Sequence, residues 1–151
     1  MNESPPSERI GFDLSRTARM WRSRLDERLA PLGLTQAKWV ILLHLSKSDG
    51  PLPQRELVDR VGVEGPTLVR LLDGLERLGL IERQDSHTDR RAKSVHLTVA
   101  AQPVLHDITR IAANLRKEIL TGISDEDLNV CLGVFGRMAR NVNAMAAKAQ
   151  Q

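Results

Sequence analysis

The positions of apolar residues predict helices over most of the chain. In the first third, apolar side chains recur every three or four residues, which is the spacing of one helix face; they are Leu14, Ala18, Trp21, Leu25, Leu29 and Leu32. We therefore predict a helix over residues 8–32, ended by Gly33. Thr35 can cap a second helix over residues 36–47. Residues 39–45 leave this second helix little polar face, which indicates that it is buried.

A shorter pair of helices follows the turn formed by residues 49–51, Asp-Gly-Pro. The first is expected over residues 54–61, and Gly62 ends it. The second begins at Pro66, a residue suited to the first helical turn, and stops before Gly79. Its inner face is leucine-rich, with Leu68, Leu71, Leu72, Leu75 and Leu78.

The spacing of apolar residues changes after Gly79. Residues 80–85 and 92–98 have strand character, and the polar stretch 86–91 between them predicts a β-hairpin with a basic tip. Two further amphipathic helices are expected, one over residues 100–121 and one that opens at Ser124. The order of elements predicts a mainly α fold with a small β-hairpin, in one domain.

Composition narrows the function only slightly. The 151 residues carry 22 Lys plus Arg against 19 Asp plus Glu, a net charge of +3. Within residues 54–98 the charges cancel, so only their placement can identify a DNA-binding face. The longest strongly apolar run, residues 39–43, is far shorter than the roughly 20 residues that span a bilayer. The polar start of the chain and its single cysteine lead us to expect a cytoplasmic protein without a disulfide.

The helix pair at residues 54–61 and from Pro66 fits a helix-turn-helix. In such a motif the second helix keeps one face in the core and leaves the other free to enter the major groove. Thr67, Arg70, Gly74 and Arg77 follow each other at steps of three, four and three residues, which places them opposite the leucines. Arginine can bond guanine twice and threonine can contact a base edge, so we predict that this face reads DNA.

The hairpin predicts a second DNA contact. Arg90 and Arg91 at its tip are suited to the negative potential of a narrow minor groove. Arg83 and Lys93, nearer its base, are expected to meet phosphates. A basic hairpin tip is often only a soluble loop, so this assignment depends on its position beside the helix-turn-helix.

These same segments resemble the MarR family. The resemblance rests on residues 66–73 (PTLVRLLD), 79–83 (GLIER) and 89–93 (DRRAK) with Leu97-Thr98. Residues 13–14, 19–22, 34–36 with Trp39, and 122–124 are similar to the SlyA-like branch. The likeness covers nearly the whole chain, and Gly65 is one departure, where a polar residue is usual in that branch.

The resemblance implies a winged helix-turn-helix homodimer that regulates transcription by binding double-stranded DNA. Residues 36–98 would form the DNA-binding lobe, and residues 8–32 and 100–148 would form the dimerisation helices. DNA-contacting positions carry over onto Pro66, Thr67, Arg70, Arg90 and Arg91, and Asp89 matches an acid that orients the wing arginines.

Two readings of the tryptophans remain open. Trp21 and Trp39 suit the core, but Trp39 with Arg19 and Arg22 also suits a pocket for an aromatic anion. The resemblance implies such a ligand, because SlyA-like proteins bind aromatic carboxylates such as salicylate between their lobes. Cys131 lies on the apolar stripe of the last helix and is expected to be a buried thiol.

The sequence argues against other functions. It contains no phosphate-binding glycine loop, no nucleophile elbow and no carboxylate pair beside a histidine, so we expect neither an enzyme nor a cofactor. The four histidines lack metal-ligand spacing, so we expect no metal. The balanced charge of residues 54–98 leaves open a winged helix that binds a protein instead of DNA.

Overall fold

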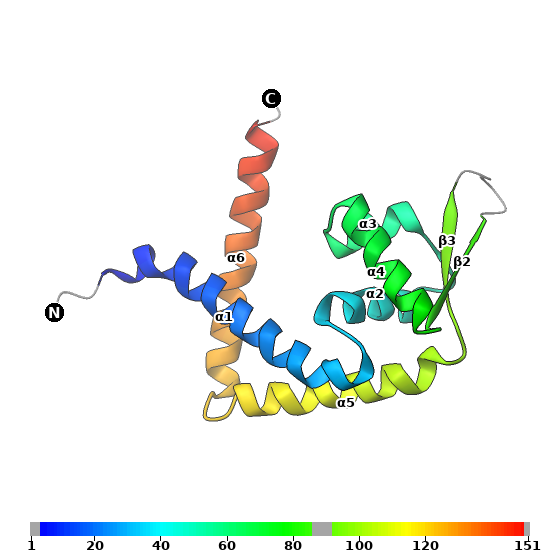
Figure 1. Ribbon diagram of the computed structural model, residues 1–151. Helices are drawn as coiled ribbons and strands as arrows, with labels where there is room; N and C mark the ends of the chain where they lie inside the picture. The colour runs from blue at the N-terminus through cyan, green and yellow to red at the C-terminus, as the bar shows by residue number, and fades with distance from the viewer. Residues whose placement is uncertain (1–3, 86–91, 150–151) are drawn as a thin grey trace. The chain divides into compact units, whose positions relative to one another are not determined.

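The computed structural model describes residues 4–85 and 92–149 (Figure 1). The order of elements is α1 (Pro6–Leu29), η1 (Ala30–Leu32), α2 (Gln36–Ser46), β1 (Leu52–Pro53), α3 (Gln54–Val61), α4 (Gly65–Arg77), β2 (Ile81–Asp85), β3 (Lys93–Leu97), α5 (Ala101–Ile119) and α6 (Asp125–Ala149). The chain divides into two compact units, one up to Leu115 and one from Arg116 onward. The predicted class, mainly helical with a small β-hairpin, is confirmed.

The start of α2 is fixed by local chemistry. Gly33 adopts a left-handed conformation, with φ of +71°, that ends the short helix η1. The Thr35 side chain then accepts a hydrogen bond from the Lys38 backbone N–H at 3.3 Å. Such a cap satisfies one of the N–H groups that lack a partner inside the helix. The two predictions for Gly33 and Thr35 are therefore confirmed, although α1 itself ends three residues earlier than expected.

The hydrophobic core of the described residues lies entirely between Leu25 and Leu115. Helices α2, α3 and α4 pack against one another and bring half of the buried leucines together. The fully buried large side chains are Leu29, Leu34, Ile41, Leu42, Leu57, Leu68, Leu72, Leu75, Ile81, Ile108 and Val95. Trp21 and Trp39 are only half-buried, so neither is a fully enclosed core residue.

A three-stranded antiparallel sheet extends from this core, in the order β1-β3-β2. The hairpin partners run from Ile81 opposite Leu97 to Asp85 opposite Lys93. Thr98 closes the base of the hairpin, because its N–H donates to the Leu80 carbonyl at 3.1 Å and its hydroxyl to the Gly79 carbonyl at 2.6 Å. The sequence did not predict β1, which has only two residues and includes a proline.

The second unit is dominated by α6. Its N-terminus is capped by Ser124, whose hydroxyl accepts a hydrogen bond from the Asp127 N–H at 3.1 Å. No residue of α6 is buried among those described, and its apolar side chains are among the most exposed: Val130 68%, Leu132 64%, Val142 63% and Met145 70%. The expected burial of Cys131 is wrong for this chain, because the apolar stripe that carries it is uncovered.

None of the helices described is long and apolar enough to cross a bilayer.

Candidate nucleic-acid interface

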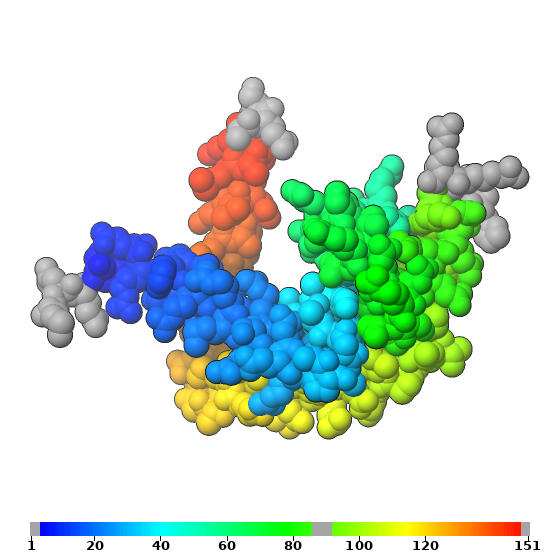
Figure 2. All heavy atoms as spheres, in the orientation of Figure 1, coloured from blue at the N-terminus to red at the C-terminus, as the bar shows by residue number. Residues whose placement is uncertain are grey.

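Helix α4 has one buried face and one exposed face. Leu68, Leu72 and Leu75 are fully buried, whereas Pro66, Arg70 and Arg77 are exposed and Thr67 is half-buried. In the space-filling view, the green atoms of α4 reach the surface of the lobe (Figure 2). Within the described part of the chain, no hydrogen bond or ion pair holds the Arg70 guanidinium. The predicted arrangement of a leucine face opposite an arginine face is therefore present on this helix.

One predicted member of the exposed face is misplaced. Gly74 is buried, and a Cβ atom added there would lie 2.9 Å from Cε of Lys38. The Lys38 side chain extends past Gly74, and its ammonium group donates a hydrogen bond to the Gly33 carbonyl at 3.2 Å. Gly74 therefore provides space for a lysine of α2 and does not belong to the reading face.

The hairpin β2–β3 lies next to α4, as Figure 1 shows. At its last described rung, Lys93 forms an ion pair with Asp85 directly across the ladder, with Nζ and Oδ1 2.5 Å apart. The Lys93 side chain is still half-exposed. Asp89, Arg90 and Arg91, predicted at the hairpin tip, lie outside the described residues.

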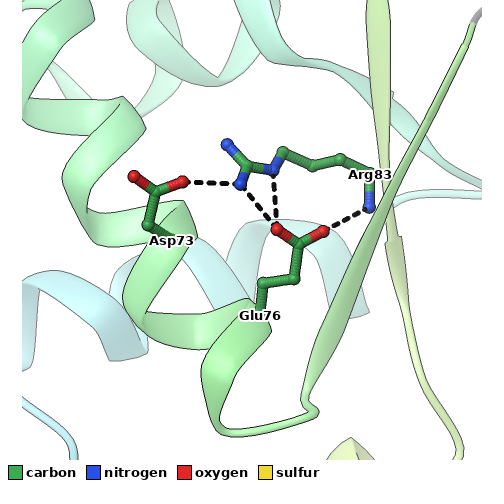
Figure 3. A network of polar contacts seen from close by, with 3 residues as sticks. All are labelled: Asp73, Glu76 and Arg83. Carbon is green, nitrogen blue, oxygen red and sulfur yellow. Dashed lines mark hydrogen bonds and ion pairs between the residues drawn. The ribbon is translucent and has the colours of Figure 1, made fainter.

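Arg83 occupies a different environment from the one expected for a phosphate contact (Figure 3). Its Nη2 atom lies 2.5 Å from Asp73 Oδ1 and 2.5 Å from Glu76 Oε2. Its Nε atom donates to the same Glu76 oxygen at 3.2 Å, and its backbone N–H donates to Glu76 Oε1 at 3.2 Å. Only 21% of the Arg83 side chain is exposed. We call these three residues the Arg83 clamp.

The charges of the clamp stabilise one another. The hydrogen bond from Arg83 lowers the pKa of Glu76 below its ordinary value of 4.5. The hydrogen bond to Glu76 in turn raises the pKa of Arg83. The clamp residues Asp73 and Glu76 were absent from the sequence predictions. Their three-residue spacing places both on one side of α4, but only the fold shows that a strand arginine lies opposite them.

The predicted ligand residues Arg19, Arg22 and Trp39 do not line the pocket that the structure shows in its described part. Arg19 donates to Ser15, one turn away on its own helix, at 2.7 Å, and Arg22 is exposed. A pocket of about 230 Å³ lies elsewhere, between the end of α2, the following turn and β3. Its polar side chains are Ser48 and His96, and His96 is hydrogen-bonded to Ser94 at 2.9 Å. Across residues 4–85 and 92–149, no three potential metal ligands come together.

An amphipathic α4 that follows a short α3 and is flanked by a hairpin defines a winged helix-turn-helix. A sequence model of the MarR family matches residues 32–92. The solved transcriptional regulator PA3341 is 47% identical to this chain, with 89% of this chain and 98% of that one covered and a TM-score of 0.77. This chain therefore belongs to the MarR family of DNA-binding transcriptional regulators and is not an enzyme.

Two more distant structures share the fold. MepR from S. aureus, solved in complex with DNA, is 22% identical, covers 88% of this chain with 97% of its own length, and has a TM-score of 0.79. CouR from Rhodococcus jostii RHA1, solved with p-coumaroyl-CoA, is 24% identical, covers 91% of this chain with 96% of its own length, and has a TM-score of 0.77.

Proposed function

We propose that this regulator binds a near-palindromic operator as a homodimer, with α4 of each subunit in the major groove. The observation that carries this proposal is Arg70 on α4, which is exposed, has no ion-pair partner among the described residues and lies opposite three buried leucines. A two-fold dimer places its recognition helices roughly 34–36 Å apart, or at multiples of that spacing, and so reads two related half-sites. The motifs given above also support placing the chain in the SlyA-like branch.

The apolar surface of the helices outside the winged-helix motif supports the dimer. On α6, Val130, Leu132, Val142 and Met145 are each more than half exposed. On α1, Phe12 and Met20 are exposed as well. Apolar faces of this kind mark contact surfaces, and most protein oligomers are symmetric dimers. We therefore assign residues 8–32 and 100–148 to dimerisation and residues 36–98 to DNA binding.

The interface residues have separate roles in this proposal. Pro66 and Thr67 lie at the start of α4, where a recognition helix approaches the bases, and Arg70 reads a base edge one turn later. Arg77 lies further along the same exposed face as Arg70, and Lys93 meets a phosphate, a contact that positions the protein without reading sequence. Arg90 and Arg91 enter the minor groove, and Asp89 orients them, as the family resemblance implies.

The test compares arginine variants on operator and scrambled DNA across a salt series, with the operator first selected from a random DNA pool. Arg70→Ala should lose about 1–3 kcal/mol of discrimination at one base position per half-site. Arg91→Ala should weaken binding on both DNAs and lower the salt slope by about one per subunit. Arg110→Ala, which removes an exposed arginine of α5, is the matched control. Unaltered base preference in Arg70→Ala would overturn the assignment of α4.

We further propose that a small aromatic carboxylate weakens operator binding through Arg19, Arg22 and Trp39. The support is the pairing of cationic and aromatic side chains, the family resemblance, and the aromatic acyl thioester bound by CouR, which shares the fold. The coupling should be about 5–150-fold in DNA affinity, and operator DNA must weaken the ligand by the same factor.

Calorimetry with salicylate tests the ligand proposal directly. Arg19→Ala and Arg22→Ala should abolish the heat of binding. Arg24→Ala, on the same helix but paired with Glu27, should retain it. If wild-type protein shows no heat with millimolar salicylate, Arg19 and Arg22 do not form the proposed site.

A further inference from the structure

Arg83 was expected to contact a DNA phosphate, but its surroundings indicate another role. The strand β2 that carries it forms the edge of the sheet, and Arg83 lies opposite the buried Val95. Its side chain crosses to α4, where it meets Asp73 and Glu76. Arg83 therefore links α4 to the hairpin, the two elements that are proposed to engage DNA.

We propose that Arg83 is a positioning residue, which fixes the wing to the recognition helix and keeps the carboxylate of Asp73 away from the DNA-reading arginines. The proposal rests on the DNA-binding role of α4 given above. It assigns Arg83 no direct contact with DNA.

The hydrogen bonds of the clamp support the first part of this role. Both oxygens of Glu76 are engaged, one by the guanidinium and the other by the Arg83 backbone N–H. Nη2 also reaches Asp73, so one planar group binds two carboxylates of α4. An arginine presents its N–H groups in a rigid fork, which a lysine cannot reproduce. The orientation of β2 relative to α4 is thereby fixed at three points on Arg83.

The spacing of charges along α4 supports the second part. Asp73 comes three residues after Arg70 and four before Arg77, and both separations commonly produce ion pairs on a helix. In the structure Asp73 pairs with Arg83 instead. Within the described part of the chain, neither Arg70 nor Arg77 has an ion-pair partner. Loss of Arg83 would leave Asp73 available to both.

The net negative charge of the clamp makes it possible to distinguish a purely electrostatic role of Glu76 from a positioning role. The two roles predict opposite changes in DNA affinity when Glu76 is neutralised. The clamp holds one positive and two negative charges beside the proposed DNA-binding face. If Glu76 acted only through its charge, Glu76→Gln would strengthen DNA binding, because a repulsive group would be gone. If Glu76 holds Arg83 in place, the same substitution must weaken it.

The experiment measures affinity and salt slope for wild type, Arg83→Gln, Glu76→Gln and Glu82→Gln on operator and scrambled DNA. Glu82 is the matched control, because it is an exposed carboxylate on the same strand that takes no part in the clamp. Arg83→Gln and Glu76→Gln should each lose about tenfold in operator affinity, the effect of one charged hydrogen bond. Their salt slopes should match wild type, and Glu82→Gln should bind at least as tightly as wild type.

Two results would overturn the proposal. If Arg83→Gln lowers the salt slope by about one per subunit while Glu76→Gln binds normally, Arg83 contacts phosphate directly. If both variants bind as wild type does, the clamp has no part in DNA binding. Circular dichroism at the assay temperature shows which variants are folded. If Arg83→Gln does not fold, the affinity of Glu76→Gln still tests the proposal. Failure of the operator model can be distinguished from failure of this proposal. In that case the wild-type protein would bind operator and scrambled DNA with equal affinity.

Discussion

Helices α4 and α6 share the same pattern of apolar residues, but their apolar faces lie in different environments. Each carries an apolar stripe at helical spacing, with charged residues on the opposite side. The stripe of α4 is buried against α2 and α3, whereas the stripe of α6 is exposed to solvent. The difference shows that two helices with the same kind of apolar stripe can differ in burial, because the stripe of α4 is covered by its own lobe and that of α6 is exposed.

The largest effect should come from the core of the lobe. Leu72 is fully buried in α4, so Leu72→Ala should lower the free energy of unfolding by about 2–5 kcal/mol through lost burial and a cavity. Urea denaturation followed by circular dichroism measures this loss. Leu132→Ala removes the same atoms from the exposed stripe of α6, and in dilute, dissociated protein it should cost far less. Equal losses for the two variants would contradict the contrast between the helices.

The second prediction concerns the same α6 leucine at higher concentration. If α6 covers its stripe in a dimer, Leu132→Ala should weaken dimerisation at least about tenfold, because burying a leucine contributes roughly 1.5–3 kcal/mol. Sedimentation equilibrium over a concentration series gives the dissociation constant. Val99→Ala is the control, since Val99 is 90% exposed and lies outside α1 and α6. A dimer that is unaffected by Leu132→Ala would place the contact elsewhere.

Sequence patterns correctly predicted the features that depend on residues close together along the chain. The range 54–61 matches α3, and the caps at Gly33 and Thr35 were correct because helix ends are decided by local conformation. The departures from expectation at Gly74 and Arg83 involve partners distant in sequence. Gly74 was placed on the exposed face because its position on the helix does not reveal Lys38, and Arg83 was assigned to phosphate because its carboxylates lie 7 and 10 residues away on another element.

The prediction that Cys131 is buried was wrong for a related reason. An apolar stripe shows that a helix face is suited to burial, but it does not say whether the covering surface belongs to the same chain. The stripe of α4 and the stripe of α6 look alike in the sequence, and only the three-dimensional structure distinguishes them.

A third prediction compares glycines in the two helices. A Cβ added at Gly133 of α6 meets nothing within 4 Å, so Gly133→Ala should stabilise the folded protein by about 1 kcal/mol through helix propensity. At Gly74 the same gain is opposed, because the Lys38 side chain must move and its bond to Gly33 is worth about 0.5–1.5 kcal/mol. Gly74→Ala should therefore change stability little in thermal unfolding. A gain at Gly74 as large as that at Gly133 would show that Lys38 adapts freely.

The smallest effect should be the pH dependence that the clamp adds to the free energy of unfolding. Arg83 lowers the pKa of Glu76 in the folded state, so the ionised carboxylate stabilises the fold. This contribution is fully present above the unfolded value near 4.5 and is lost as the pH falls through the lower folded value. The difference in unfolding free energy between wild type and Glu76→Gln, measured from pH 7 to pH 3, should be constant at first and shrink below about pH 4.5. A difference that does not change with pH would mean that the ion pair is absent in solution.

The closed base of the hairpin has a consequence for how such proteins diversify. Thr98 joins the two ends of the hairpin at Gly79 and Leu80, directly between the end of α4 and the start of α5. Insertions or deletions between β2 and β3 therefore leave the junction of the two helices unchanged. The entropy of closing a loop also depends only weakly on its length, since each doubling costs about 0.6 kcal/mol. The length and composition of the wing tip can thus vary among descendants of this sequence without a compensating change in the recognition helix.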